Sequence, residues 1–423
     1  MKKFIVHFII LLFLNSSFLI LNSEAQWVLQ YSDTSFNLID IKFTSDNTGW
    51  AVGYKGYSSL NSTGRLLKTT NGGNNWILQN TGTLPGIWGV NFIDINTGWI
   101  VGDRGLVRKT TNGGLNWIPQ FIDTTQNAER VYFLNSNTGW ITGEYLYKTS
   151  NGGDNWVKDI NAPFASKAIY FLNSNTGFLT SYYCRIHKTT NAGLNWNWKY
   201  SGSQHTFLYD IFFLNDNTGW TADESDGVIR TTNAGENWNR IYQISGAYCI
   251  FFKNANTGWI GGSIPYYIMR TTNGGLNYVS QYLSLELYNI WKITKSNDSS
   301  IYAIGMPASI FKTTNGGVGI NQISTEISSS FSLSQNYPNP FNPVTKIRFD
   351  VASTPLIPLR RGTLVVLKVY DVMGREVRTL VNERLQPGMY EVSFDGSALT
   401  SGVYFYKIQS GDFVQTNRMV LIK

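Results

Sequence analysis

The chain of 423 residues contains few charged residues, only three histidines and only two cysteines. Charged residues make up 14% of it, and beyond residue 25 the histidines are His187 and His205. No histidine or cysteine has a second ligand at zinc-site spacing. No EF-hand loop, phosphate-cradling glycine loop or nucleophile elbow occurs either. We therefore predict no metal and no cofactor, and we interpret His187 as a packing residue rather than a ligand.

A concentrated positive charge is also missing. Lysine and arginine number 34 against 27 acidic residues, a net charge of +7 that is spread thinly and forms no basic stripe. Nucleic-acid binders concentrate such charge on one face. We therefore expect no nucleic-acid partner.

Long apolar runs are confined to the first 25 residues, where Lys2 and Lys3 precede an apolar run from Phe4 to Leu14. Ser23 and Ala25 then stand at the −3 and −1 positions of a cleavage site. These features predict a secretory signal peptide over residues 1–25. The alternative is a retained membrane anchor, although polar residues interrupt the run before it reaches the roughly 20 residues of a span. We expect no transmembrane segment in the mature chain.

The two cysteines, Cys184 and Cys249, lie more than one repeat unit apart, too far for a disulfide. We predict two buried, unpaired thiols. A catalytic thiol is the alternative, but no histidine accompanies either cysteine in a recognisable pattern.

Internal repetition is the strongest signal. The string Asn-Thr-Gly-Trp ends at Trp50 and recurs, as does the string Lys/Arg-Thr-Thr/Ser-Asn-Gly/Ala-Gly. Seven copies of the two strings alternate at a mean spacing of about 41 residues, which accommodates four short strands. The asparagines of the second string are Asn71, Asn112, Asn151, Asn191, Asn233, Asn273 and Asn315.

Each unit is predicted to contain four strands, A to D. Strand A alternates apolar and polar residues, as in Ile41 and Phe43, and strand B follows with Trp50-Ala51-Val52-Gly53. Strand C ends in the Lys-Thr-Thr string, whose asparagine and glycines supply the turn into strand D at Trp76. The seventh unit lacks strand D, whereas an unattached strand D, residues 26–30, precedes the first unit. Pairing the two closes a ring, so we predict a seven-bladed β-propeller over residues 26–322. An open solenoid is the alternative.

The string from Thr69 to Trp76 resembles the Asp-box of bacterial-neuraminidase-type repeats, with asparagine in place of the usual aspartate. Together with the Thr-Gly-Trp-Ala-Val-Gly strand, it resembles the photosystem II stability/assembly factor-like propellers. The resemblance implies a structural role for the asparagines. It implies little about activity, because propellers carry many functions.

A second domain is predicted after a polar linker, residues 323–332. Residues 333–423 contain the blocks Asn336-Tyr337-Pro338-Asn339-Pro340, Asp371-Val372-Met373-Gly374 and Gly402-Val403-Tyr404. They resemble the type A C-terminal sorting domain of the type IX (Por) secretion system, a small β-sandwich. The resemblance implies recognition of residues 333–423 by that machinery, after Sec export, and delivery to the medium or the outer-membrane surface. An ordinary adhesive sandwich is the alternative. The predicted fold class is thus all-β, a seven-bladed propeller followed by a small sandwich.

The B–C and D–A loops share one face of the predicted ring and differ from unit to unit. Variable loops on a rigid ring are typical of protein or glycan recognition, and unconstrained drift is the alternative. We expect a non-catalytic propeller that binds an extracellular protein or glycan. A sialidase-like glycoside hydrolase is the other hypothesis, with Asp103, Glu144, Asp223 and Glu224 as candidate acids, although an arginine trio is not recognisable. The candidate ligand face contains Tyr54, Tyr57, Asp103, Arg104, Glu144, Tyr145, Tyr182, Tyr183, Asp223, Glu224, Tyr266 and Tyr267.

Overall fold

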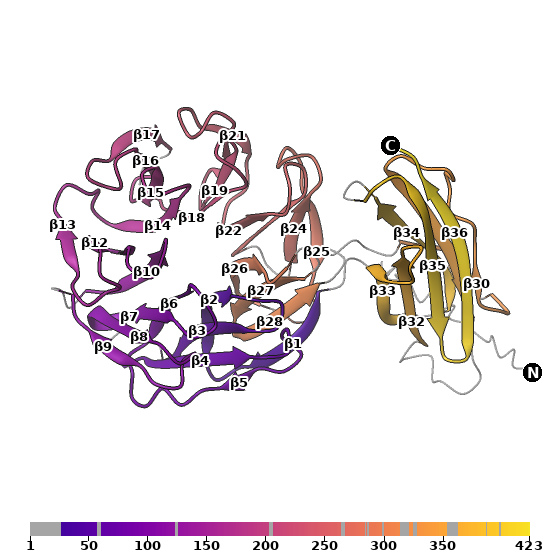
Figure 1. Cartoon of the computed structure of the whole chain (residues 1–423), viewed down its shortest axis with the longest axis horizontal. Coiled ribbons are helices and arrows are strands. Elements are labelled where there is room, and N and C mark those ends of the chain that lie inside the picture. Colours follow the sequence, from indigo (N-terminus) through magenta and orange to yellow (C-terminus); the bar gives the residue numbers. More distant parts are fainter. Residues whose placement is uncertain are drawn as a thin grey trace, which may run out of the picture.

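A computed structural model describes residues 27–423 except 57–60, 123–125, 203–205, 264–266, 284, 286, 298–299, 314–320, 325–327, 353–362, 386 and 397–398. The regular secondary structure of the described part is β-strand, apart from one short 3-10 turn, η1 (Asp103–Gly105). None of its elements is a helix long and apolar enough to cross a membrane. The strands form nine four-stranded sheets, of which seven encircle a central opening (Figure 1).

The seven sheets are antiparallel blades whose first strands contact one another around the opening. In order from the centre outward, blades 1 to 3 are β2 (Asn37–Phe43), β3 (Gly49–Lys55), β4 (Thr63–Thr69), β5 (Ile77–Leu78); β6 (Ile87–Phe92), β7 (Gly98–Gly102), β8 (Leu106–Thr110), β9 (Ile118–Gln120); and β10 (Ala128–Phe133), β11 (Gly139–Gly143), β12 (Leu146–Thr149), β13 (Val157–Asp159). Blades 4 to 6 are β14 (Ser166–Phe171), β15 (Gly177–Ser181), β16 (Arg185–Thr189), β17 (Asn197–Ser201); β18 (Leu208–Phe213), β19 (Gly219–Asp223), β20 (Gly227–Thr231), β21 (Asn239–Tyr242); and β22 (Ala247–Phe252), β23 (Gly258–Gly262), β24 (Tyr267–Thr271), β25 (Val279–Tyr282).

Blade 7 joins the two ends of the repeat array. It consists of β26 (Asn289–Lys295), β27 (Ile301–Met306), β28 (Ala308–Thr313) and, as its outer strand, β1 (Val28–Asp33). Leu29 pairs with Phe311 in this ladder, and the buried Trp27 indole donates a hydrogen bond of 3.0 Å to Gln281 Oε1 of blade 6. The predicted seven-bladed, closed ring is therefore confirmed. The predicted strand over residues 26–30 was placed too early, since pairing runs from Val28 to Asp33.

Neighbouring blades pack through aromatic rings that the repeat places at fixed positions. At five junctions the strand-B ring of one blade stacks on the strand-A phenylalanine of the next, as in Trp50 on Phe92 at 3.6 Å and Trp99 on Phe133 at 3.5 Å between centroids. Tyr302 of blade 7 stacks on Phe43 of blade 1 at 4.3 Å, so the same contact closes the ring. Each buried ring contributes several kcal/mol of gross apolar burial, at about 25 cal/mol per Å2.

Hydrogen bonds, referred to as latches, accompany several of these stacks. Lys68 Nζ and Trp50 Nε1 both donate to the carbonyl oxygen of Gly113 in the next blade, at 2.8 and 3.2 Å. Lys312 Nζ and Tyr302 Oη donate in the same way to Gly72, both at 2.7 Å. Lys148 and Lys188 donate likewise to the carbonyl oxygens of Ala192 and Ala234, at 2.6 and 2.7 Å. Among the described residues, four lysines of the repeated string thus tie their blade to the hairpin of a neighbouring blade.

The remaining two sheets form a β-sandwich around one apolar core. One sheet has the order β29 (Asn321–Ser324), β34 (Gly388–Asp395), β31 (Val344–Val351), β30 (Ser332–Leu333). The other has the order β33 (Glu376–Leu385), β32 (Thr363–Tyr370), β35 (Gly402–Ser410), β36 (Phe413–Leu421). Strand β29 spans the predicted boundary between residues 322 and 323 and pairs with β34 of the sandwich.

Candidate binding site at the channel mouth

Each inner strand carries a β-bulge or a related irregularity near its first residues. The pairing register shifts between Leu38 and Asp40 in blade 1, and six equivalent shifts occur in the other blades. A bulge leaves one residue unpaired and re-aims its side chain. These residues are Ile39, Trp88, Glu129, Tyr209, Tyr248 and Trp291, with Lys167 inside the longer irregularity of blade 4.

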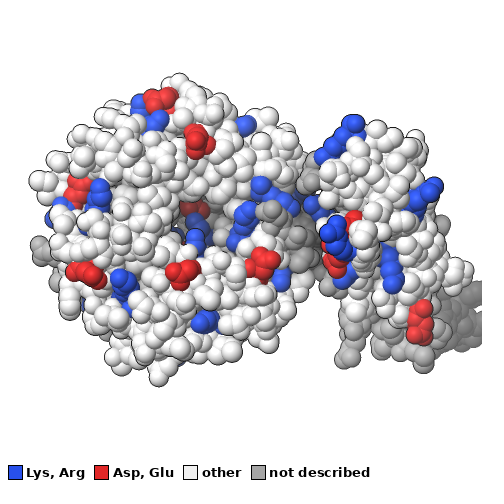
Figure 2. Space-filling model, viewed as in Figure 1, with Lys and Arg blue, Asp and Glu red and all other residues white. Residues whose placement is uncertain are grey.

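The bulged side chains converge on a central cavity of about 200 Å3. It is lined by Ile39, Trp88, Glu129, Arg130, Lys167, Tyr209 and Trp291. Because the inner strands begin where the D–A loops end, this cavity belongs to the face formed by the B–C and D–A loops. Figure 2 shows lysine or arginine and acidic side chains gathered inside the ring opening. We refer to this cavity, together with the adjoining Tyr248, as the channel mouth.

Aromatic rings form much of the channel-mouth wall. The Tyr248 ring lies 4.9 Å from both the Tyr209 and the Trp291 rings, and the Tyr54 ring stacks on Trp88 at 5.2 Å. The Trp88 indole is held in place because its Nε1 donates to Asp103 Oδ1 at 2.8 Å. The mouth therefore presents fixed, half-buried aromatic surfaces.

One ion pair lies among these rings. Lys167 Nζ is 2.5 Å from both carboxylate oxygens of Glu129, and it also lies 4.6 Å from the centre of the Phe207 ring. Arg130 donates at 2.9 Å to the carbonyl oxygen of Trp88. The site thus combines apolar surface with cationic donors and one carboxylate acceptor, which suits a ligand that has both polar and apolar parts.

Charged residues continue below the mouth. Lys292 Nζ lies 2.7 Å from Asp210 Oδ1, while Asp210 Oδ2 accepts a hydrogen bond from the Ile250 backbone. Burial lowers the pKa of Lys42, with Asp40 opposing the shift and Lys292 adding to it. The Asp210 carboxylate thus ties the inner strand of blade 5 to the inner strands of blades 6 and 7.

Both tyrosines of the mouth lie near the carboxylate of Glu224. Burial raises the pKa of Tyr209, and the carboxylate of Glu224 raises it further. Tyr248 Oη also donates to Glu224, at 3.5 Å. A phenol with a raised pKa stays protonated at neutral pH.

The sequence-predicted face residues divide into several groups. Tyr54, Asp103 and Glu224 support the channel mouth through the contacts above, and the Tyr182 ring lies 4.8 Å from Phe207, beside Lys167. Arg104 is exposed, while Asp223 is fully buried and accepts hydrogen bonds from two backbone amides of its own turn. Glu144, Tyr145 and Tyr183 lie toward blades 3 and 4, away from the cavity lining. Tyr57, Tyr266 and the side chain of Tyr267 lie outside the described residues.

Sequence reasoning missed the bulged residues because it looked for variation only in the loops. The sequence nevertheless varies at one position of strand A. This position lies two residues before the central apolar residue of the strand, which is Ile41 in blade 1. That position is isoleucine, tryptophan, glutamate, lysine, tyrosine, tyrosine and tryptophan in the seven copies. Such variety inside an otherwise uniform strand indicates side chains that do not pack in the blade.

The hairpin asparagines make one repeated pattern. Asn71 Oδ1 accepts from Thr69 Oγ1 at 3.1 Å and from the Asn75 amide at 2.9 Å, while Thr69 Oγ1 accepts from the Gly73 amide. Five further asparagines repeat it: Asn112, Asn151, Asn191, Asn233 and Asn273. Asn315 lies outside the described residues. These contacts are what a turn-capping role requires.

The two cysteines are free and buried, as predicted. Burial raises the pKa of Cys184 to about 12, and it also raises that of Cys249. Such thiols are poor nucleophiles at neutral pH. His187 is buried within blade 4, where its Nε2 lies 3.1 Å from Ser181 Oγ.

Comparison with known families agrees with both domains. Residues 80–200 match the family model of the photosynthesis system II assembly factor YCF48, and residues 335–423 match that of the secretion system C-terminal sorting domain. Two successive regions of the chain thus resemble a YCF48-like propeller and a secretion-system C-terminal sorting domain. That domain marks the chain for type IX secretion to the cell surface or outside the cell.

Solved structures share the propeller fold. YCF48 bound to a D1 peptide is 18% identical, with a TM-score of 0.56 over 68% of this chain and 94% of that chain. YCF48 from Cyanidioschyzon merolae is 17% identical, with a TM-score of 0.54 over 68% and 98%. PorZ, a surface component of the type IX secretion system of Porphyromonas gingivalis, is 13% identical, with a TM-score of 0.54 over 91% of this chain and 59% of that chain. A search of curated proteins found no match.

Proposed function

We propose that the secreted propeller is a non-catalytic recognition protein that binds an extracellular protein through its channel mouth. The ligand segment that fits the mouth best is a short extended peptide. The observation that carries the proposal is the convergence of the bulged side chains on one cavity. A bulge disrupts the hydrogen-bond ladder between two strands. Bulges are common next to functional sites, where they re-aim a side chain.

The mixed chemistry of the mouth favours a peptide over a glycan there. Trp88, Tyr209 and Trp291 offer surfaces for an apolar side chain, while Lys167, Glu129 and Arg130 offer partners for amides and charged groups. YCF48, which shares the fold, has been solved with a D1 peptide. A glycan at the same mouth remains the other outcome of the test below.

A sialidase-like hydrolase is less well supported. Such an enzyme needs arginines for the substrate carboxylate and two carboxyl groups across the scissile bond. Among the described residues that line the cavity, Arg130 is the one arginine and Glu129 is the one acid, and Glu129 is paired with Lys167. Asp103 and Asp223 are buried, and their carboxylates already accept hydrogen bonds, Asp103 from the Trp88 indole and Asp223 from the Ser225 amide of its own turn.

The test is selection from a random 12-residue peptide library and, separately, from a glycan array, on the purified chain. We expect peptides that bind saturably and lose at least tenfold in affinity on Lys167→Gln. Ile118→Ala, an exposed change on the outer strand of blade 2, is the control and should have no effect. Glycans selected alone would contradict the peptide assignment, and turnover of fluorogenic sialosides or other aryl glycosides would contradict the non-catalytic role.

A further inference from the structure

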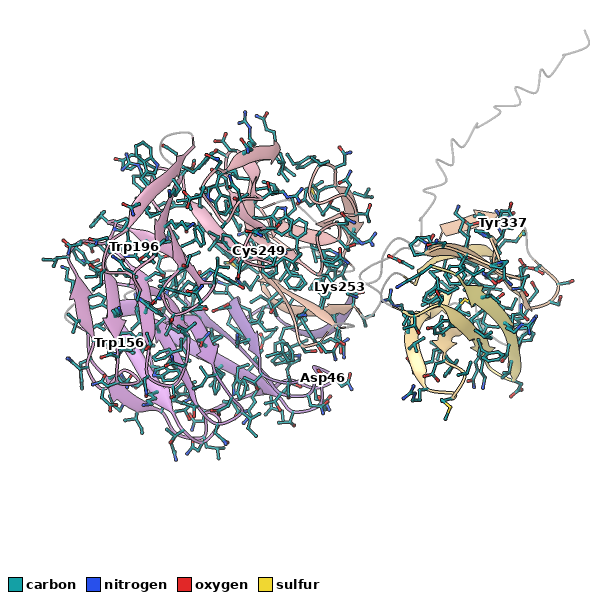
Figure 3. The ribbon with its side chains drawn as sticks, turned by 45° about the horizontal axis from the view of Figure 1, so that its top comes forward. Asp46, Trp156, Trp196, Cys249, Lys253 and Tyr337 are labelled. Atoms are coloured by element: carbon teal, nitrogen blue, oxygen red, sulfur yellow. The ribbon has the colours of Figure 1, made fainter. Side chains whose placement is uncertain are left out.

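A second cavity lies on the outer part of blades 3 and 4 and shares no lining residue with the channel mouth. Its volume is about 330 Å3, and its lining includes Phe164, Ser181, Tyr183, Arg185, His187 and Trp196. Figure 3 shows Trp196 toward the outside of the ring and Cys249 nearer its centre. We refer to this cavity and the adjoining Trp198 as the rim pocket.

Large aromatic side chains are unusually exposed around the rim pocket. Phe164 and Trp198 are each 61% exposed, and Tyr183 is 40% exposed. The Trp198 indole is fixed because its Nε1 donates at 2.6 Å to the Tyr200 carbonyl oxygen. Exposed aromatic rings that are held in one orientation provide flat surfaces for a ligand.

Arg185 occupies the space between two of these rings. Its guanidinium carbon lies 5.4 Å from the centre of the Tyr183 ring and 5.4 Å from that of Trp198. Among the described residues it makes no ion pair with a carboxylate. A guanidinium beside two aromatic rings can still use its N–H groups, whose planar arrangement matches a carboxylate.

The turn that contains Tyr183 has an unfavourable backbone conformation. Tyr183 and Cys184 have φ values of 63° and 50°, in the left-handed region that non-glycine residues rarely adopt. In blades 1 and 5 the corresponding loop has Gly56 and Gly227 at positive φ. The turn is held from both sides, since the Cys184 amide donates to Thr206 and its carbonyl oxygen accepts from Gly202. Residues kept in such conformations are concentrated at functional sites.

The inner wall of the pocket is polar but uncharged. His187 Nε2 lies 3.1 Å from Ser181 Oγ, and burial lowers the pKa of His187 to about 4. The neutral imidazole and the hydroxyl can each donate and accept hydrogen bonds. Arg185 is the one charged residue that lines this cavity.

We infer that the rim pocket is a second ligand site that binds an acidic sugar residue, a pyranose carrying a carboxylate. The exposed rings would stack on the sugar's C–H face, Arg185 would pair with the carboxylate, and the hydroxyl and imidazole would meet sugar hydroxyls. A compact cavity with one cation fits a single charged ring better than it fits an extended peptide. The site is independent of the proposed peptide-binding mouth.

The test is calorimetric titration of the purified chain with methyl β-glucuronide, methyl β-glucoside and an acidic peptide. We expect saturable binding of the glucuronide and at least tenfold weaker binding of the glucoside. Arg185→Gln and Trp198→Ala should each weaken glucuronide binding at least tenfold. Lys167→Gln at the channel mouth should leave the glucuronide affinity unchanged. A failure of the rim-pocket inference can therefore be distinguished from a failure of the proposed peptide site.

Arg65→Gln is the matched control, because Arg65 stands at the same position of strand C in blade 1, bonded instead to Thr63 and Gly64. It should bind the glucuronide like the parent chain, and both exposed rim variants should keep the parent's melting temperature. No saturable glucuronide binding, equal binding of glucoside and glucuronide, binding of the acidic peptide alone, or full affinity in Arg185→Gln would each overturn the inference.

Discussion

At the residue scale, one side-chain oxygen organises each hairpin of the repeat. Asn112 Oδ1 accepts hydrogen bonds of 3.0 Å from both Thr110 Oγ1 and the Asn116 amide. These partners sit in a turn with two glycines at positive φ, Gly113 and Gly114. Without the oxygen, the turn would lose both acceptor contacts at once.

Asn112→Ala should therefore lower the free energy of unfolding by about 1 to 2 kcal/mol. Asn112→Asp should keep most of the stability, since a carboxylate accepts the same bonds. Asn116→Ala, at an exposed neighbouring side chain, is the control and should cost less than about 0.5 kcal/mol. Urea unfolding checks this series, and equal losses at the two asparagines would contradict the capping role.

His187 gives a pH-dependent prediction. Burial, reinforced by Arg185, lowers its pKa from 6.5 to about 4 in the folded chain. As the pH falls below 6.5, the unfolded chain takes up the proton first, so folding loses stability progressively down to about pH 4. His187→Gln should remove this component, on the order of 2 kcal/mol between pH 7 and pH 4.5. Thermal unfolding at both pH values checks it, and an unchanged pH dependence would refute it.

At the element scale, ring stacks and lysine latches attach neighbouring blades to one another. The corresponding basic position of the repeat is lysine in five copies and arginine at Arg230 and Arg270. In blade 1 the contact is the 2.8 Å hydrogen bond from Lys68 Nζ to the Gly113 carbonyl oxygen.

Lys68→Ala should lower the free energy of unfolding by about 1 kcal/mol or more, because it leaves a partly buried carbonyl with one donor fewer. Lys68→Arg should lose less than half as much, since the repeat itself uses arginine at two such positions. Chemical denaturation distinguishes them. If arginine were as damaging as alanine, the latch would not depend on a cationic donor.

Much of the element pattern follows directly from the sequence. The alternation in strand A and the paired Gly-Trp and Asn-Gly strings predict the four strands and their turns, because both depend on local sterics and burial. The bulges were not predicted. A bulge depends on how two strands pair across a blade, so the strand residues alone do not disclose that Trp88 or Tyr209 turns toward the channel.

At the scale of the whole molecule, β1 closes the ring. Its pairing with β28 covers an edge that would otherwise be open, and Trp27 shares the Gln281 Oε1 acceptor with Trp259 Nε1. Sequence counting predicted this closure because a strand was missing from one end of the array and in excess at the other.

Removal of residues 26–33 should therefore destabilise the entire propeller, by about 3 kcal/mol or more, because it removes a strand ladder and the buried Trp27. Val28→Ala, at an exposed position of the same strand, is the control. Loss of blade 7 alone, with an unchanged main unfolding transition, would contradict cooperative closure.

The most direct test of the functional account is hydrogen–deuterium exchange on the chain with and without a saturating library-selected peptide. The proposal predicts protection around the bulges of β6, β18 and β26, where Trp88, Tyr209 and Trp291 line the mouth. The hairpins after strand C, which lie on the opposite face, should exchange at unchanged rates. Protection confined to those hairpins or to the outer strands, with the three bulges unaffected, would show that the channel mouth is not the binding site.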